Sequence, residues 1–342
     1  MPTCLYCART NPPGGFTREH VLQDAFGHFK NALTLHDSVC GDCNQSFGDH
    51  IDRVFARDSI EAVLRLVHGV KDPKKSRGMF KDRIRIRQPQ DGSILGGAYV
   101  EITAPPPGQD RVGGRLVTQV GFQRRNGTGW DYFTEEELQA SGDLASRFEG
   151  EYEPGVKNVV GSNEDTVRLM ALMRARGVPL EGKVFDPELS HTGPAEVSVS
   201  WIFDDVLARA VAKIAVNYLA FSQGAEFARR PEFEDVRRFV RYGEGRPPTF
   251  VQPQPGALIE QRKGGDPPPY HVVVLFWSPG MRPPMLCRLT VFNRHTYLVR
   301  LCTGFYGPLW REVKSGHTHD VAANECRELE RTVILPPEGW AF

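Results

Sequence analysis

Four cysteines near the amino terminus have the spacing of a zinc site. They form two pairs, Cys4-Leu-Tyr-Cys7 and Cys40-Gly-Asp-Cys43, with residues 8–39 between them. Each Cys-x2-Cys pair forms a tight knuckle that directs two thiolates at one ion, and four thiolates complete a tetrahedral coordination sphere. The spacing therefore predicts a structural zinc ion, with no open position for substrate.

A second set of candidate ligands lies between and just after these pairs. Glu19 and His20 precede the second pair, and Asn44 follows it directly. A carboxylate and an amide oxygen are hard ligands that suit Mg²⁺ or Mn²⁺, and an imidazole can take a proton from water. These are the parts of a one-metal phosphodiesterase. The simpler alternatives are a solvated turn for Glu19-His20 and a helix N-cap for Asn44, and an N-cap is compatible with metal binding.

Four short motifs together resemble the HNH endonucleases, in the branch where a zinc knuckle braces the ββα-metal finger. The motifs are Cys4-x2-Cys7, Arg18-Glu19-His20-Val21, Cys40-x2-Cys43-Asn44 and Phe47-Gly48. The resemblance covers residues 1–58 and implies a β-hairpin packed on a helix. It also implies that Glu19 is a ligand of the catalytic divalent ion, that His20 is the general base, and that Asn44 is the second metal ligand, where many relatives carry His.

Two positions depart from that family pattern. Many HNH enzymes have an Asn on the second hairpin strand that orients the base, and here His36, Asp37 or a backbone carbonyl would have to serve. Many relatives also have a third His or Asn one turn after the position of Asn44, which is Gly48 in this chain. The sequence leaves open which neighbouring polar residue supports the site: Asp49, His50 or Asp52.

The overall composition is that of a globular chain. It has 342 residues, 42 Lys and Arg against 42 Asp and Glu, and 40% hydrophobic residues, which excludes disordered, collagen-like and fibrous classes. Seven cysteines are too few for a disulfide scaffold. No apolar run approaches the roughly 18 residues of a membrane span, and the first residues do not resemble a signal peptide. We therefore expect a cytoplasmic protein without membrane contact.

The expected fold class is α+β. The pattern predicts a zinc-braced ββα module over residues 1–70, followed by a larger mixed α+β region over residues 71–342. Apolar residues at steps of three and four from Phe47 to Leu66 predict one amphipathic helix, or two with a break near Asp58. A second long helix is expected from Asp204 to Gly224. Strands are expected at 272–277, 286–292 and 297–301, and a Pro-rich linker or long loop at 246–270.

The remaining polar motifs have simpler interpretations. Residues 71–90 are strongly basic, and the alternation over 83–87 predicts a strand with a cationic face that is either solvated or in contact with phosphates. Lys213 and Asn217 are expected on a polar helix edge. His317 and His319 are expected in a polar loop rather than a second metal site. Three late cysteines are expected to be small buried hydrophobes: Cys287, Cys302 and Cys326.

The predicted function is a Mg²⁺- or Mn²⁺-dependent endonuclease that hydrolyses phosphodiester bonds. The resemblance favours DNA over RNA, and a role in restriction or phage defence is a hypothesis. Because one site makes one cut, the expected product is a nick unless a homodimer acts on both strands. The alternative is a non-catalytic zinc-knuckle module that binds nucleic acid or protein. Residues 71–342 could recognise substrate or sense a regulatory ligand, but no motif in them identifies one.

Overall fold

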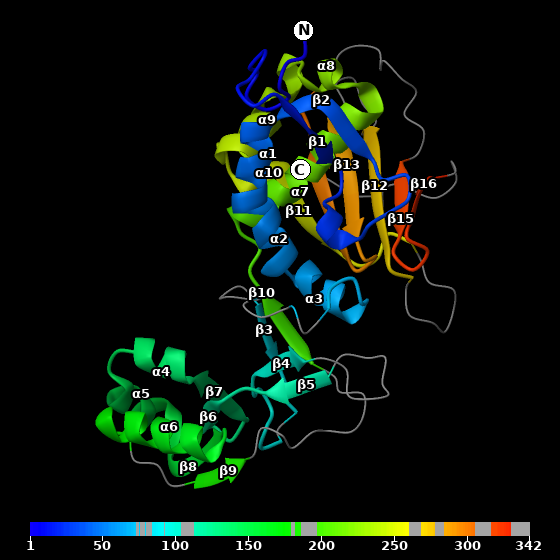
Figure 1. Ribbon diagram of the computed structural model, residues 1–342. Coiled ribbons are helices and arrows are strands. Elements are labelled where there is room, and N and C mark those ends of the chain that lie inside the picture. Colours follow the sequence, from blue (N-terminus) through cyan, green and yellow to red (C-terminus); the bar gives the residue numbers. More distant parts are fainter. Residues whose placement is uncertain are drawn as a thin grey trace. The chain divides into compact units, whose positions relative to one another are not determined.

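The chain divides into two compact units, shown in the computed structural model of Figure 1. The structure describes residues 1–72, 75, 79, 84–91, 93–103, 113–178, 182–185, 197–259, 268–277, 284–304 and 316–329. The first unit combines residues 1–71 with 202–342, and the second is residues 72–201. This division differs from the predicted boundary at residue 70, because the segment after residue 201 packs on the N-terminal module. Among the described residues, no helix has the length and hydropathy needed to span a bilayer.

The N-terminal module is a β-hairpin followed by a helix. Strands β1 (Phe16–His20) and β2 (Thr34–Cys40) pair antiparallel, and α1 (Gly41–Phe47) starts directly after β2 and packs on both strands. A short 3-10 helix, η1 (Asp24–Phe26), lies in the connection between the strands. The hairpin and α1 therefore form the ββα arrangement that the resemblance implies.

The helical segment after the hairpin is interrupted where the sequence predicts. It continues from α1 through the π-helix η2 (Gly48–Asp52) into α2 (Arg53–Arg57), and α3 (Ile60–Val67) begins after a break. Ser59 caps α3 by accepting a hydrogen bond from the Ala62 backbone N–H. The predicted break near Asp58 is confirmed.

Helix α7 (Asp205–Gln223) lies at the centre of the first unit. Asp204 caps its start, accepting hydrogen bonds from the backbone N–H groups of Val206 and Leu207, and Gly224 follows its end with a φ of 98°. The helix packs against strands of the large sheet and also against β2, η2 and α2 (Figure 1). Residues from Ala210 to Ala220 are consequently all buried.

A six-stranded sheet completes the first unit, in the order β11-β14-β13-β12-β15-β16. The predicted strands near 272–277, 286–292 and 297–301 are confirmed as β12, β13 and β14. The elements of this part are α8 (Ala225–Ala228), η4 (Pro231–Phe233), α9 (Glu234–Tyr242), α10 (Pro247–Phe250), β11 (Val251–Pro255), β12 (Tyr270–Trp277), β13 (Met285–Val291), β14 (His295–Arg300), β15 (His317–Asp320) and β16 (Glu325–Glu328).

Two predictions for this region are wrong. The predicted linker or long loop at 246–270 contains α10 and β11, and the part of it at 260–267 lies outside the described residues. His317 and His319 lie in strand β15 rather than in a loop, and His319 is almost fully buried. The three late cysteines are buried, as expected.

The second unit is built on a four-stranded sheet in the order β7-β6-β8-β9, with two further strand pairs, β3-β10 and β4-β5. Its apolar core includes Val120, Phe122, Leu138 and Leu169. The predicted strand at 83–87 is confirmed as β3. The elements are β3 (Ile84–Arg87), β4 (Val100–Thr103), β5 (Gly113–Leu116), β6 (Gln119–Arg124), β7 (Trp130–Thr134), α4 (Glu135–Ala140), α5 (Leu144–Glu151), β8 (Tyr152–Val160), α6 (Asn163–Ala175), β9 (Gly182–Phe185) and β10 (Ser198–Trp201).

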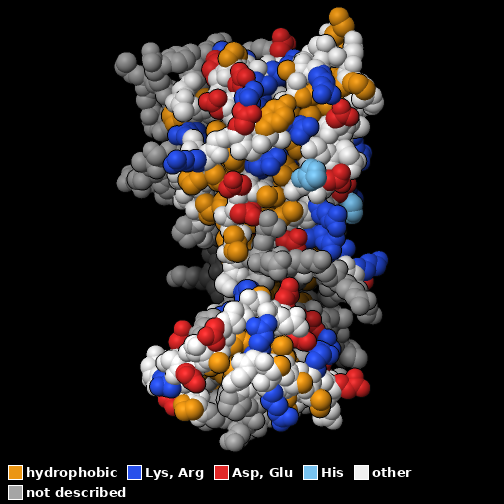
Figure 2. Space-filling view, turned by 90° about the vertical axis from the view of Figure 1, so that its left-hand side faces the viewer, with side chains coloured by type: hydrophobic (Ala, Val, Ile, Leu, Met, Phe, Trp, Pro, Cys, Tyr) orange, Lys and Arg blue, Asp and Glu red, His pale blue; other side chains and the backbone are white. Residues whose placement is uncertain are grey.

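Side chains of both charge signs are interspersed on the face shown in Figure 2, in keeping with the balanced composition.

The basic stretch at residues 71–90 has eight Lys and Arg residues. Four of them lie outside the described residues: Lys74, Arg77, Lys81 and Arg83.

Candidate metal centre and active site

The four N-terminal cysteines converge on one point. Their sulfur atoms all lie within 4.8 Å of one another, and Cys4, Cys40 and Cys43 are buried. The second knuckle joins the last residue of β2 to the first turn of α1, so an ion held by these sulfurs would tie the hairpin to the helix. The backbone N–H of Cys40 also donates to the Cys4 sulfur at 3.5 Å. This donor set fits a closed tetrahedral zinc site, which stabilises the module without touching substrate.

The pKa values of three of these thiols favour a cation at their centre. Hydrogen bonding from Cys43 lowers the pKa of Cys4 to about 4, so this sulfur is a thiolate. Burial and the charge of Cys4 raise the pKa of Cys40 to about 11, and the pKa of Cys43 is raised mainly by its hydrogen bond to Cys4. One thiolate thus opposes the ionisation of the next, and a dication at their centre removes this repulsion.

His20 is positioned by Asp24, a residue that the sequence analysis did not single out. The imidazole Nδ1 lies 2.9 Å from Asp24 Oδ1, and 18% of the His20 side chain is exposed. Among the described residues, Nε2 has no hydrogen-bond partner. Burial lowers the pKa of His20 below its usual 6.5, and although Asp24 opposes this effect, the net shift is downward. The imidazole is therefore neutral at neutral pH.

The two predicted orienting residues on β2 do not contact His20. The register places Thr17 opposite Val39 and Glu19 opposite Leu35, so β2 has a bulge between these pairs. Asp37 lies in this bulge with a φ of 53°, and the ring of His36 hydrogen-bonds to Thr34 instead. Both side chains are exposed.

Glu19 faces the opposite side of β1 from His20 and is buried. Its carboxylate Oε1 lies 2.5 Å from the ammonium of Lys213 and accepts a hydrogen bond from the amide of Asn217 at 2.9 Å. Both partners come from α7. Burial raises the pKa of Glu19, and Lys213 only partly offsets this effect. Oε2 accepts no hydrogen bond from any described residue.

The ammonium of Lys213 bridges two carboxylates. It lies 2.6 Å from Asp52 Oδ2, and the Gln23 amide donates to the other oxygen of Asp52 at 2.6 Å. Burial disfavours the charged lysine, but the two carboxylates raise its pKa by more, so it stays protonated. One ammonium thus faces two carboxylates, of which Glu19 is buried and Asp52 is half-buried. The excess of one carboxylate favours a further cation.

The prediction that Lys213 and Asn217 lie on a polar helix edge is wrong. Lys213 is 1% exposed and Asn217 is fully buried. Asn217 Oδ1 accepts a hydrogen bond from Tyr6 at 2.6 Å, while its nitrogen also donates to the backbone oxygen of His20 at 3.1 Å. The pair thus connects the first zinc knuckle to the end of β1. The signal in the sequence was two polar residues one turn apart with apolar residues on every side.

Asn44 is fixed to the hairpin through its amide nitrogen. This nitrogen donates to Thr17 Oγ1 at 2.9 Å and to the Arg18 backbone oxygen at 3.2 Å. Its amide oxygen accepts no hydrogen bond from the described residues. The structure therefore places Glu19, His20 and Asn44 on one ββα element, with Glu19 and His20 on opposite faces of β1.

Asp49, His50 and Asp52 were the predicted alternatives to a ligand at the position of Gly48. Of these three, Asp52 contacts Lys213, which also contacts Glu19. Asp49 is exposed and accepts a hydrogen bond from Gln45 at 2.7 Å, and His50 is exposed.

The hairpin and helix form a ββα module that carries a four-sulfur donor set suited to zinc and the side chains of Glu19, His20 and Asn44. The family model described as HNH endonuclease matches residues 4–60. The match confirms the resemblance and supports a nuclease-type function, with a divalent metal and nucleic acid as the general requirements of such a domain. No curated protein and no solved structure matches the chain.

Proposed function

We propose that this protein is a metal-dependent HNH endonuclease that hydrolyses phosphodiester bonds in DNA, with His20 as the general base. The observation that supports it most directly is the state of His20. Its imidazole is neutral and partly exposed, and its Nδ1 lies 2.9 Å from the Asp24 carboxylate.

The His20–Asp24 contact determines which nitrogen can accept a proton. The 2.9 Å distance between Nδ1 and the Asp24 carboxylate favours the proton of the neutral ring on Nδ1, because an ionised carboxylate offers acceptors alone. Nε2 then has a free lone pair with which to take a proton from the attacking water. The imidazolium that forms lies beside the negative charge of Asp24, which stabilises it.

Two oxygen atoms of the same ββα element have the chemistry of ligands for a divalent ion. Glu19 Oε2 and the amide oxygen of Asn44 are both without hydrogen-bond donors among the described residues, and both are hard ligands. Lys213 carries one positive charge and contacts two carboxylates, the buried Glu19 and the half-buried Asp52. We propose Glu19 and Asn44 as the residues that hold Mg²⁺ or Mn²⁺. Such an ion, when bound, neutralises charge on the scissile phosphate and the leaving oxygen.

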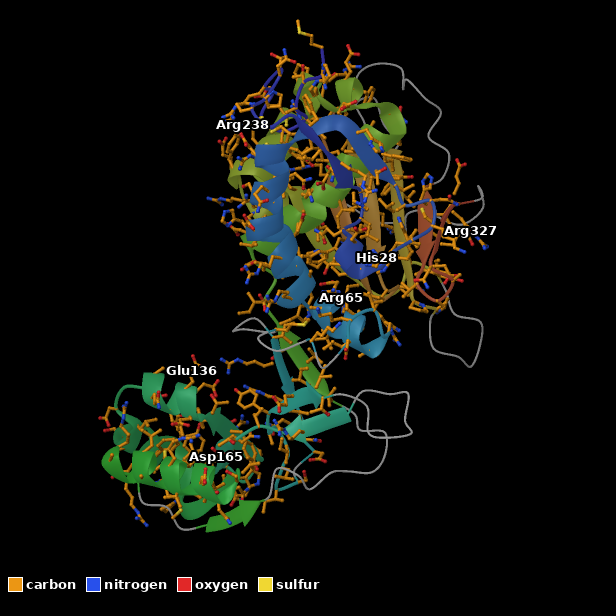
Figure 3. The ribbon with its side chains drawn as sticks, viewed as in Figure 1. His28, Arg65, Glu136, Asp165, Arg238 and Arg327 are labelled. Carbon is orange, nitrogen blue, oxygen red and sulfur yellow. The ribbon has the colours of Figure 1, made fainter. Side chains whose placement is uncertain are left out.

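The test is cleavage of supercoiled plasmid by the zinc-loaded full chain, with Mg²⁺, Mn²⁺ or a chelator. We expect nicking that requires the metal, and a rate about 100- to 10,000-fold lower for His20→Ala, with zinc content and unfolding transition unchanged. His28→Ala is the matched control, because His28 lies 3.9 Å from the same Asp24 oxygen and is 87% exposed (Figure 3). We expect this control to cleave normally.

Equal cleavage by His20→Ala and the unaltered chain would refute the assignment of the base. Metal-independent binding of DNA with no cleavage by the unaltered chain would favour the non-catalytic zinc-knuckle module instead. A parallel reaction with single-stranded RNA separates the two polymers, since cleavage of RNA alone would contradict the choice of DNA.

A further inference from the structure

The second unit has a polar cavity of about 240 Å³. Two arginines of β3, Arg85 and Arg87, line it together with Tyr99, residues of β7 and Glu137 of α4. The side chain of Arg85 is 45% exposed, so the cavity opens to solvent beside it. These arginines belong to the basic stretch of the sequence and are not used by the nuclease site.

Two arginines and two carboxylates line the cavity, but one of the two carboxylates is already paired with an arginine outside the lining. Arg85 forms an ion pair with Glu137. Asp131, the other carboxylate of the wall, is bound in a bidentate manner by Arg124, at 2.9 Å to one oxygen and 2.5 Å to the other. Among the described residues, no carboxylate lies within 4 Å of the Arg87 guanidinium. Arg87 therefore supplies the unmatched charge of the cavity, although Asp131 lies close enough for Arg87 to lower its pKa.

Tyr99 holds the Arg87 guanidinium in a fixed orientation. The guanidinium carbon lies 4.5 Å from the centre of the Tyr99 ring, and Nη2 donates to the Tyr99 hydroxyl at 2.5 Å. The same hydroxyl accepts from Arg85 at 2.6 Å and donates to Glu137 at 3.0 Å. A cation held in this way loses little conformational entropy when it binds a ligand.

Most hydrogen-bond donors of Arg87 have no partner among the residues that the structure describes. A guanidinium has five N–H donors, and among the described acceptors only the Tyr99 hydroxyl is bonded to it. Its Nε is buried without a partner. A planar fork of free donors matches the two oxygens of a carboxylate or phosphate, which it binds in a bidentate manner.

We infer that this cavity binds a small organic oxyanion, a phosphate or carboxylate whose charged group pairs with Arg87. The volume lies below the roughly 300 Å³ at which pockets for drug-sized ligands begin, so the ligand is no larger than about one nucleotide. The inference is independent of the proposed nuclease activity, since binding is measured without cleavage.

The experiment is calorimetric titration of the zinc-loaded full chain with adenosine 5′-monophosphate, inorganic phosphate and succinate, and with adenosine as the uncharged control. We expect at least one oxyanion to bind with a dissociation constant below 1 mM, and adenosine not to bind. Binding of both phosphate compounds but not succinate identifies a phosphate site, and the converse result identifies a carboxylate site.

Variants connect the binding to Arg87. We expect Arg87→Gln to weaken binding at least tenfold and Arg87→Lys, which keeps the charge but not the fork, to weaken it less. Arg115→Gln is the matched control, because Arg115 is an exposed arginine of the same unit that pairs with Glu101 outside the cavity. Unfolding midpoints of all variants confirm that they fold. The inference fails if no oxyanion binds, or if Arg87→Gln and Arg115→Gln bind alike.

Discussion

Replacement of Lys213 by Met should destabilise the first unit by removing the cation between two carboxylates. Met keeps most of the length of the side chain, so the change is mainly one of charge. The Glu19 side chain is 4% exposed and that of Asp52 is 17% exposed, so Glu19 is left as a buried, unpaired charge, while water can partly solvate Asp52. Breaking a buried ion pair in this way costs about 3–5 kcal/mol. The lower end is expected, because Glu19 can take up a proton.

The loss of unfolding free energy in Lys213→Met should depend on pH through the ionisation of Glu19. Without Lys213, the pKa of Glu19 rises further above its usual 4.5, which burial already raises in the unaltered chain. A carboxyl group whose pKa is higher in the folded state binds more protons there, so stability falls as the pH rises through that pKa. The loss of unfolding free energy should therefore be larger at pH 8 than at pH 5.

Urea-induced unfolding of the full chain, followed by release of zinc to a coloured chelator, measures the stability of the first unit. Arg209→Met is the control, because Arg209 lies one turn earlier on the same helix and donates to backbone oxygens rather than to a carboxylate. Its expected cost is about 1 kcal/mol. The double variant Lys213→Met with Glu19→Gln should recover part of the loss. The reasoning is refuted if the two single variants lose the same stability, or if the loss is independent of pH.

Three further outcomes are expected. Cys40→Ser should abolish stoichiometric zinc binding and unfold the N-terminal module, as metal analysis and circular dichroism would show, because metal binding and folding are coupled in such sites; retained zinc would contradict the four-sulfur site. Asp24→Asn should slow cleavage about tenfold or more, yet less than His20→Ala, since the base remains but its tautomer is no longer fixed; an unchanged rate would exclude orientation by Asp24. His319→Leu should reduce the fall in unfolding free energy that the unaltered chain shows between pH 7 and pH 5. Burial lowers the pKa of His319 to about 3, so the unfolded chain binds the extra proton below about pH 6.5 and acid destabilises the fold. Equal slopes in denaturation curves would rule this out.

The local parts of the site were predictable from the sequence because they depend on short spacings. Each Cys-x2-Cys pair and the helix break near Asp58 are set by residues within one or two turns of each other, and the ββα order was implied by the family resemblance of the motifs. The position of α7 was predictable for the same reason, since its cap and its apolar residues are local signals. In contrast, the burial of Glu19 depends on a partner 194 positions away, and no periodicity reports that distance.

Two misinterpretations have identifiable physical causes. Prolines suggested a linker at 246–270, but Pro253 lies in β11, an edge strand of the sheet, where one side of the backbone needs no ladder hydrogen bonds. The division of the chain was missed because the second unit is inserted within the first. The sequence changes character at residue 71, but nothing in it shows that the chain returns to the first unit at residue 202.

Glu19 and Asp52 pair with Lys213 of α7, which the ribosome adds much later. The ribosome adds about 5–20 residues per second, so Lys213 follows residue 71 by roughly 7–30 s. During this interval the emerging hairpin can acquire zinc, yet Glu19 and Asp52 have no counter-charge and remain hydrated. Completion of the first unit therefore waits for the second unit and then α7 to be translated. A nascent chain that stalls before residue 213 contains Glu19, His20 and Asn44 but lacks the lysine that pairs with Glu19.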